Sequence, residues 1–403
     1  MGNRRPTCIG VNPRSRSTFS SEGNLKKIPP LKRRLLQGNI MVTTHNTSRP
    51  KIGILLENHF EDSEFQVPYR ALQDAGAEVV VLGSRMNDEY TGKRGKVNVR
   101  PDATATEVRS DDFDAILIPG GAAPDRIRTN PNAVSIVMDA MAQGKLVAAI
   151  CHGPQVLIEA DQLRGKQATG YRAIRKDMQN AGATYIDEPL VMQDNLITAR
   201  RPGDTPIFTT AILINLGLSL ENTELPDVAS ENYEWWQLGE TWGGSTRDEI
   251  VYALNTAISG ENYTLKTFEE YGKRARDTEL GVILAEVVTT KQRHIQLLEA
   301  RLSAFGESVT WQAVGGDALA ALQSWLQSND SDMEIARRAL GDLQTGVVDA
   351  YHLSSQLTDP ITAALFDDIE ERLALHERRF GDFCRARSQA TVEPPMPTTL
   401  AFA

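Results

Sequence analysis

Between Lys51 and about residue 218, short apolar runs alternate with segments of helical periodicity, and no other feature of the chain constrains its fold as strongly. The apolar runs have the length of buried strands. Strands that are joined by helices run parallel, and the helices then cover both faces of the sheet. We therefore predict an α/β domain over residues 51–218. The predicted strands are 52–56, 79–82, 115–118, 146–150 and 195–199, the predicted helices are 62–75, 134–141 and 206–216, and residues 91–99 form a predicted hairpin.

From Arg247 onward the pattern changes, and apolar residues recur at the spacing of amphipathic helices. Four such stripes fill residues 247–388, with a longer connection at 306–330 between the middle two. This pattern is typical of an all-α four-helix bundle. Residues 219–246 lie between the two regions and are rich in tryptophan. We predict that they form a linker whose aromatic side chains pack on one or both domains.

The two ends of the chain have the composition of unfolded segments. Residues 1–50 contain ten Lys or Arg and one acid, Glu22, without the apolar core of a secretory signal. We expect a disordered basic leader, with an organelle transit segment or an over-long translation start as the alternatives. Residues 389–403 contain Pro394-Pro395 and are predicted to form a disordered tail.

Charge and cysteine usage narrow the functional classes. The net charge of −10 disfavours binding to nucleic acid or to anionic membranes. No apolar stretch reaches the roughly 18 residues of a membrane span. The three cysteines, Cys8, Cys151 and Cys384, are far apart and odd in number. Disulfide frameworks use even sets, so we expect a reducing, cytoplasmic location.

The segment around Cys151 is the best candidate for a reactive site. The apolar strand 146–150 ends directly before Cys151, and His152, Gly153 and Pro154 follow. A nucleophile at such a strand-to-helix turn is held away from the neighbouring backbone. The N-terminus of the following helix is expected to favour the thiolate over the thiol. The alternative is a buried structural cysteine, which is common for this residue type.

Two other loops are predicted to meet Cys151 at the carboxyl edge of the sheet, where ligands gather in open α/β folds. Gly120 and Gly121 follow the strand 115–118 and are candidates for the backbone amides of an oxyanion hole. Glu61 follows the first strand and is a candidate acid. A plain tight turn and an acid that favours the helix N-terminus are the respective alternatives.

Residues 51–218 resemble the PfpI family of intracellular protease I and related stress proteins, within the class I glutamine amidotransferase-like superfamily. This resemblance implies a flavodoxin-like parallel sheet sandwiched by helices. It depends on segments spread over the whole domain, namely Phe60-Glu61-Asp62, Thr91-Gly92-Lys93, Ile118-Pro119-Gly120-Gly121, Arg126-Ile127-Arg128, Ile150-Cys151-His152-Gly153-Pro154-Gln155 and Leu163-Arg164-Gly165.

The resemblance also implies roles for individual residues. Cys151 corresponds to the family's nucleophile and His152 to its partner, while Glu61 would hydrogen-bond the sulfur. In the family a glutamate from a neighbouring subunit completes a triad, and the matching position here is Asp125, one methylene shorter. A homo-oligomer is therefore expected.

Two chemistries follow from the resemblance, and both begin when a thiolate adds to a carbonyl. The first is a stress-related glyoxalase or deglycase reaction on methylglyoxal or its adducts, which we favour because nothing resembles an extended peptide groove. The second is an intracellular cysteine peptidase. A redox-sensing or interaction protein without turnover is the third hypothesis. The expected partner is a small carbonyl compound or a peptide, and no cofactor is predicted.

The second half, residues 247–388, resembles ferritin-like four-helix bundles. Di-iron members of this class carry Glu-x-x-His on two helices. Here the residue three before His294 is Lys291, and the residue three before His376 is Leu373. Glu261, His294 and His376 fall on or beside the apolar stripes and are weak candidates for metal ligands. A buried polar cluster is the alternative that we favour.

Overall fold

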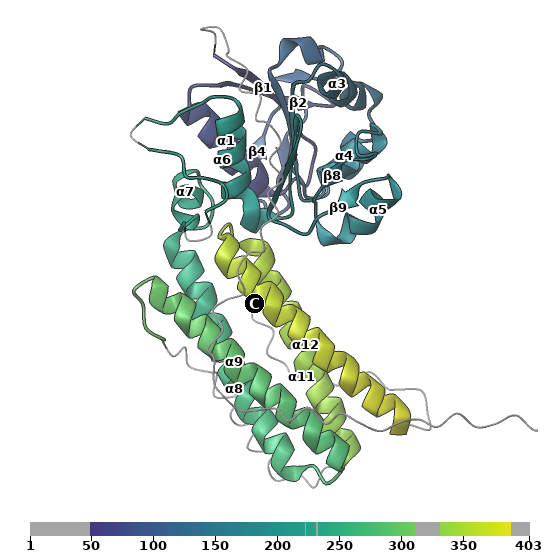
Figure 1. Ribbon diagram of the computed structural model, residues 1–403, viewed down its shortest axis with the longest axis vertical. Helices are drawn as coiled ribbons and strands as arrows, with labels where there is room; N and C mark the ends of the chain where they lie inside the picture. The colour runs from purple at the N-terminus through teal and green to yellow at the C-terminus, as the bar shows by residue number, and fades with distance from the viewer. Residues whose placement is uncertain (1–48, 222, 231–232, 311–330, 388–403) are drawn as a thin grey trace, which may run out of the picture. The chain divides into compact units, whose positions relative to one another are not determined.

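The structure is a computed structural model that describes residues 49–221, 223–230, 233–310 and 331–387 (Figure 1). The predicted leader, apart from its last two residues, and the predicted tail lie outside the described residues. So does most of the connection predicted at 306–330. Across the described ranges, no helix is long and apolar enough to cross a bilayer.

A seven-stranded sheet forms the centre of the first domain, in the order β10-β11-β7-β6-β1-β2-β5. All neighbouring strands are parallel except β10 and β11, which pair antiparallel. This confirms the predicted fold class. The strands are β1 (Lys51–Leu55), β2 (Glu78–Gly83), β5 (Ala103–Thr104), β6 (Ala115–Ile118), β7 (Leu146–Ile150), β10 (Leu190–Gln193) and β11 (Leu196–Ala199).

Helices cover both faces of this sheet. One face carries α1 (Asp62–Asp74) and α6 (Thr205–Asn215), and the other carries α3 (Pro131–Ala142) and α4 (Pro154–Glu159) (Figure 1). Since β6 and β7 are apolar along their whole length, they lie in the middle of the sheet, where all but one of their residues are buried. The predicted bounds of these two strands are those of the structure.

Several elements of the first domain are short. The predicted hairpin is present as β3 (Tyr90–Thr91) paired antiparallel with β4 (Asn98–Val99). The sequence prediction missed the others, because each is too short to show a periodicity. They include α2 (Ala123–Ile127), β8 (Gln167–Ala168), α5 (Arg175–Asn180) and β9 (Thr184–Tyr185), besides the edge strands β5 and β10.

In the described part of the linker, residues 236–241 form a short helix, α7 (Trp236–Thr241). Its tryptophans pack as predicted: Trp235 and Trp242 are buried in the core of the first domain, and Trp236 packs against the bundle core. The bundle helices are α8 (Arg247–Arg274), α9 (Thr278–Ala304), α11 (Asp332–Gln356) and α12 (Pro360–Arg387) (Figure 1). Their apolar stripes form a core of their own.

Candidate active site

Cys151 occupies a strained turn directly after β7. Its φ angle is +60°, a left-handed conformation that is uncommon for residues other than glycine. Two backbone hydrogen bonds hold the turn: the Cys151 N–H donates to Ala199 O at 3.0 Å, and the Tyr171 N–H donates to Cys151 O at 2.8 Å. Strain of this kind persists where the surrounding structure over-determines it, and it is concentrated at functional sites. The residue is only 6% exposed.

Glu64, rather than the predicted Glu61, is the carboxyl group at the sulfur. Its side chain is fully buried and forms a hydrogen bond with the Cys151 thiol. A second hydrogen bond fixes the carboxyl group, since the Gly120 N–H donates to Glu64 Oε2 at 2.8 Å. The assignment of Glu61 to this contact was therefore wrong.

Glu61 forms ion pairs with two basic residues of the hairpin loop. Lys93 Nζ lies 3.0 Å from Glu61 Oε2, and Arg94 Nη2 lies 2.8 Å from Glu61 Oε1. Because Glu61 is the N-cap of α1, its side chain leaves the helix before the first turn, whereas Glu64 lies within that turn. Glu61 still acts on the site through its charge, which helps to raise the pKa of Glu64.

The two glycines predicted to form an oxyanion hole face other groups. The amide of Gly120 is engaged by Glu64 at 2.8 Å. The amide of Gly121 donates to the Cys151 sulfur and by itself lowers the pKa of the thiol. In this structure both amides have partners on the protein, and the predicted oxyanion-hole role stays a prediction. The pair shapes the surroundings of the sulfur.

His152 lies beside the sulfur in a position to accept its proton. The Nδ1 atom is 3.3 Å from Cys151 Sγ, and the ring packs on Tyr171 with a centroid distance of 4.8 Å. Burial lowers the pKa of His152, and the positive charge of Lys93 lowers it further. The imidazole is therefore neutral at neutral pH and can act as a base.

The expected thiolate is not favoured in the resting site. Burial, followed by the negative charges of Glu64 and Glu61, raises the pKa of Cys151 above its ordinary value. The helix dipole invoked for the thiolate is weak here, because α4 starts only at Pro154 and has six residues. Burial also raises the pKa of Glu64 to about 8. Both groups therefore hold their protons at neutral pH.

Asp125 lies on the surface, in the first turn of α2, and its carboxylate pairs with Arg128 at 2.6 Å. Its negative charge reaches His152, where it opposes the lowering of the imidazole pKa. The role predicted for Asp125 across a subunit interface, and the homo-oligomer that this role requires, stay predictions.

A substitution at Gly120 is expected to damage the site. A Cβ atom there would lie 2.6 Å from both Cys151 Cβ and Glu64 Oε2, with the backbone nitrogen of His152 at 2.9 Å. We expect Gly120→Ala to cost about 1–3 kcal/mol of stability and to lower turnover more than tenfold. Gly272→Ala is the matched control, because a Cβ there meets nothing within 4 Å. Urea unfolding and initial rates measure both effects, and a Gly120→Ala protein indistinguishable from Gly272→Ala would contradict the packing argument.

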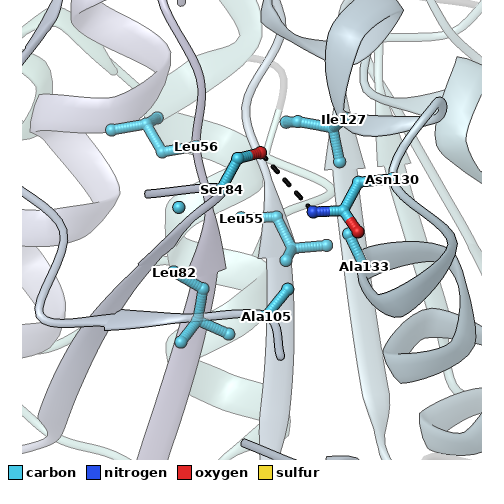
Figure 2. Close-up of a pocket in the computed structure, with 9 residues that line it drawn as sticks. Leu55, Leu56, Leu82, Ser84, Ala105, Ile127, Asn130 and Ala133 are labelled. Carbon is cyan, nitrogen blue, oxygen red and sulfur yellow. Dashed lines mark hydrogen bonds between the residues drawn. The ribbon is translucent and has the colours of Figure 1, made fainter. Parts of the chain in front are cut away.

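A small apolar pocket lies at the carboxyl ends of strands β1 and β2, beside the start of helix α3 (Figure 2). Asn130 Nδ2 donates to Ser84 Oγ at 3.5 Å across it. Neither Cys151, His152 nor Glu64 lines it. The lining residues are Leu55, Leu56, Leu82, Gly83, Ser84, Ala105, Ile127, Asn130 and Ala133.

Residues 50–215 match the DJ-1/PfpI family. General stress protein 18 of Bacillus subtilis is 46% identical over 159 residues, which are 39% of this chain and 92% of that protein. Deglycase PfpI of Pyrococcus furiosus is 46% identical over 154 residues, 38% of this chain and 92% of that protein. The chain belongs to the DJ-1/PfpI family.

The helical domain of this DJ-1/PfpI protein also has a solved counterpart. A two-domain protein from Anabaena variabilis, containing DJ-1/ThiJ/PfpI-like and ferritin-like domains, is 51% identical in sequence. The match covers 88% of this chain and 100% of that chain, with a TM-score of 0.83. The DJ-1/PfpI domain is thus followed by a ferritin-like domain, as the sequence predicted.

The polar cluster in the bundle core does not fit a ferritin-type di-iron site. Lys291 Nζ lies 3.1 Å from Glu261 Oε1, so an ammonium group occupies the carboxylate where a metal ion would bind. His294 Nδ1 contacts Glu261 Oε2 at 3.1 Å, while His376 bonds to Thr290 Oγ1 at 2.9 Å instead of joining them. Within the described part of the chain, no group of three or more His, Cys, Asp or Glu could hold a metal ion.

This cluster is expected to matter for stability. Burial alone would raise the pKa of Glu261, but Lys291 and His294 hold it at about 2. Lys291→Met leaves a buried carboxylate without its main counter-charge and should cost about 3 kcal/mol of unfolding free energy. The matched control is the double variant Glu261→Gln, Lys291→Met, which removes both charges and should recover most of the loss. Equal losses in the single and double variants, measured by chemical denaturation, would contradict this interpretation.

Sequence reasoning missed three residues that contact the reactive group or its partners. Glu64 could have been found, because it shares a helical stripe with Val67, Pro68, Ala71 and Leu72, all of which are buried. Arg94, which pairs with Glu61, and Tyr171, which packs on His152, had no comparable signal, because both lie in irregular loops.

Proposed function

We propose that residues 50–215 form a cysteine-dependent enzyme for small carbonyl compounds, which converts methylglyoxal or its adducts to lactate. The observation that carries the proposal is the buried Cys151 sulfur, 3.3 Å from the neutral imidazole of His152 and hydrogen-bonded to the protonated Glu64. The low exposure of Cys151 favours a two- or three-carbon aldehyde over an extended peptide chain. Relatives that are named deglycases support the same chemistry.

The proposed reaction uses each of these groups. The Cys151 thiol adds to the aldehyde carbon, and its proton passes through His152 to the aldehyde oxygen, which gives a hemithioacetal. A base then removes the hydrogen from that carbon and returns a proton to the neighbouring ketone carbon, while the hydroxyl proton of the hemithioacetal passes to the former ketone oxygen. The product is the lactoyl thioester of Cys151. Glu64 suits this transfer, because a carboxyl group with a pKa of about 8 is a stronger base than an ordinary carboxylate once it ionises. The resulting thioester is hydrolysed by water, which releases lactate and restores the thiol.

A substrate comparison tests this proposal. The purified protein is given free methylglyoxal, an N-acetylarginine adduct of methylglyoxal, and a panel of unmodified peptides, and lactate and new amino termini are measured. We expect lactate from methylglyoxal well above the spontaneous rate. Peptide cleavage without lactate would contradict the proposal and favour the peptidase.

The adduct separates two forms of the activity. An enzyme that consumes only free aldehyde cannot release lactate from the adduct faster than the adduct dissociates by itself. A deglycase attacks the adduct directly, so its rate rises with enzyme concentration beyond that limit. We expect a rate beyond the limit, and a plateau at the dissociation rate would restrict the function to free aldehydes.

A further inference from the structure

The end of helix α11 in the bundle connects to His152 through one tyrosine. Tyr351 Oη lies 3.1 Å from Tyr171 Oη, and the Tyr171 ring packs on the imidazole of His152. The Tyr171 N–H also donates to the carbonyl of Cys151. Tyr171 therefore contacts both members of the reactive pair, and its hydroxyl is held by the bundle.

Tyr351 is itself fixed by charged neighbours. The Arg172 guanidinium lies over the Tyr351 ring, 5.5 Å from its centroid. The same guanidinium pairs with Glu370 of α12 at 2.5 Å. Two bundle helices thus share in placing the hydroxyl that meets Tyr171.

A second connection reaches the acidic side of the site. The Arg94 guanidinium donates to the carbonyl oxygens of Ser355 and, at 3.0 Å, Gln356, both at the end of α11. The same guanidinium pairs with Glu61, whose charge acts on Glu64. Carbonyls at a helix C-terminus carry partial negative charge and have no partner in their own helix, so they suit a guanidinium.

We propose that the ferritin-like bundle contributes to the active site through Tyr351. This tyrosine is a positioning residue that acts on His152 through Tyr171. The carbonyl groups of Ser355 and Gln356 hold Arg94 against Glu61 on the other side of Cys151. Where the test measures turnover, this inference rests on the proposed function. General stress protein 18 and deglycase PfpI match 39% and 38% of this chain and 92% of their own length, so these two relatives have no counterpart of the bundle.

The test is a double-mutant cycle in the full chain. Tyr351→Phe and Tyr171→Phe each remove one hydroxyl of the pair and leave the rings in place. We expect each to lower kcat by about 3–10-fold, the effect of one lost hydrogen bond, with KM unchanged. The double variant should equal either single variant, because both substitutions break the same contact. Tyr252→Phe is the matched control, since Tyr252 lies on α8 and is 65% exposed.

Two further readouts exclude a merely structural effect. The acid limb of the kcat–pH profile reports on His152, and it should shift in Tyr351→Phe but not in Tyr252→Phe. The rate of Cys151 alkylation by iodoacetamide should change in parallel, and this measurement needs no substrate. Unfolding midpoints of all variants are compared so that a loss of fold is recognised.

The outcomes distinguish the inference from the proposed function. If the wild type turns over methylglyoxal and Tyr351→Phe matches it in kcat, pH profile and alkylation rate, the positioning role is overturned. Additive losses in the double variant overturn it too, because Tyr351 would then not act through Tyr171. If no substrate is turned over but Tyr351→Phe changes the alkylation rate of Cys151, the proposed function fails and the positioning role holds.

Discussion

Cys151→Ser is expected to abolish lactate formation, with a loss of about 10³-fold or more in kcat. The substitution changes one atom, so the hydrogen bonds of the turn to Ala199 and Tyr171 remain. A serine hydroxyl ionises far less readily than a thiol, and His152 cannot remove its proton as easily. Initial rates with methylglyoxal measure the effect, and circular dichroism and urea unfolding establish that the fold is kept.

A matched control uses the other described cysteine. Cys384 is buried in the bundle core and contacts none of the site residues described above. Cys384→Ser should leave turnover within about twofold of the wild type, although it loses some stability because a buried sulfur is replaced by a hydroxyl. If Cys151→Ser retains the rate of Cys384→Ser, Cys151 is not the nucleophile.

Glu64→Gln is expected to change how stability depends on pH by several kcal/mol. Burial, and then the charge of Glu61, raises the pKa of Glu64 from 4.5 to about 8. The folded protein thus binds this proton more tightly than the unfolded chain does. The stabilisation is complete below about pH 4.5 and is lost as the pH rises through about 8, with an upper bound of about 5 kcal/mol. Glutamine cannot titrate, so the variant lacks this loss.

The measurement is the unfolding free energy of both proteins between pH 5 and 9. The difference between wild type and Glu64→Gln isolates the contribution of this one group, because the other titrating residues are common to both. The wild type should lose stability relative to the variant as the pH rises. Parallel curves would mean that Glu64 is ionised in the folded protein at neutral pH, which contradicts the proton assignment at Cys151.

The parts of the fold that were predicted correctly are those whose sequence shows an unbroken apolar run or a regular helical period. Strands β6 and β7 were predicted residue for residue, because an unbroken apolar run fits a buried central strand. The bundle helices also showed a clear period. The edge strand β10 was missed, since its half-buried residues give no comparable signal.

The site was predicted less completely, because a sequence does not show how a helix is rotated. Cys151 and His152 follow directly from the end of a strand. Glu61 is the N-cap of α1, and Glu64 lies in the first turn of the same helix. Which of the two carboxyl groups reaches Cys151 depends on how the start of this helix is rotated toward Cys151. The sequence likewise does not show that the Gly120 N–H donates to Glu64.

The central claim is that the sulfur of Cys151 bonds to the carbonyl carbon of the substrate. ¹³C NMR of the protein mixed with methylglyoxal labelled at the aldehyde carbon tests this most directly. We predict a resonance of a sulfur-bonded tetrahedral carbon in the wild type, absent from Cys151→Ser. The claim would be contradicted if labelled lactate accumulated while both proteins showed only the free aldehyde, its hydrate and the product.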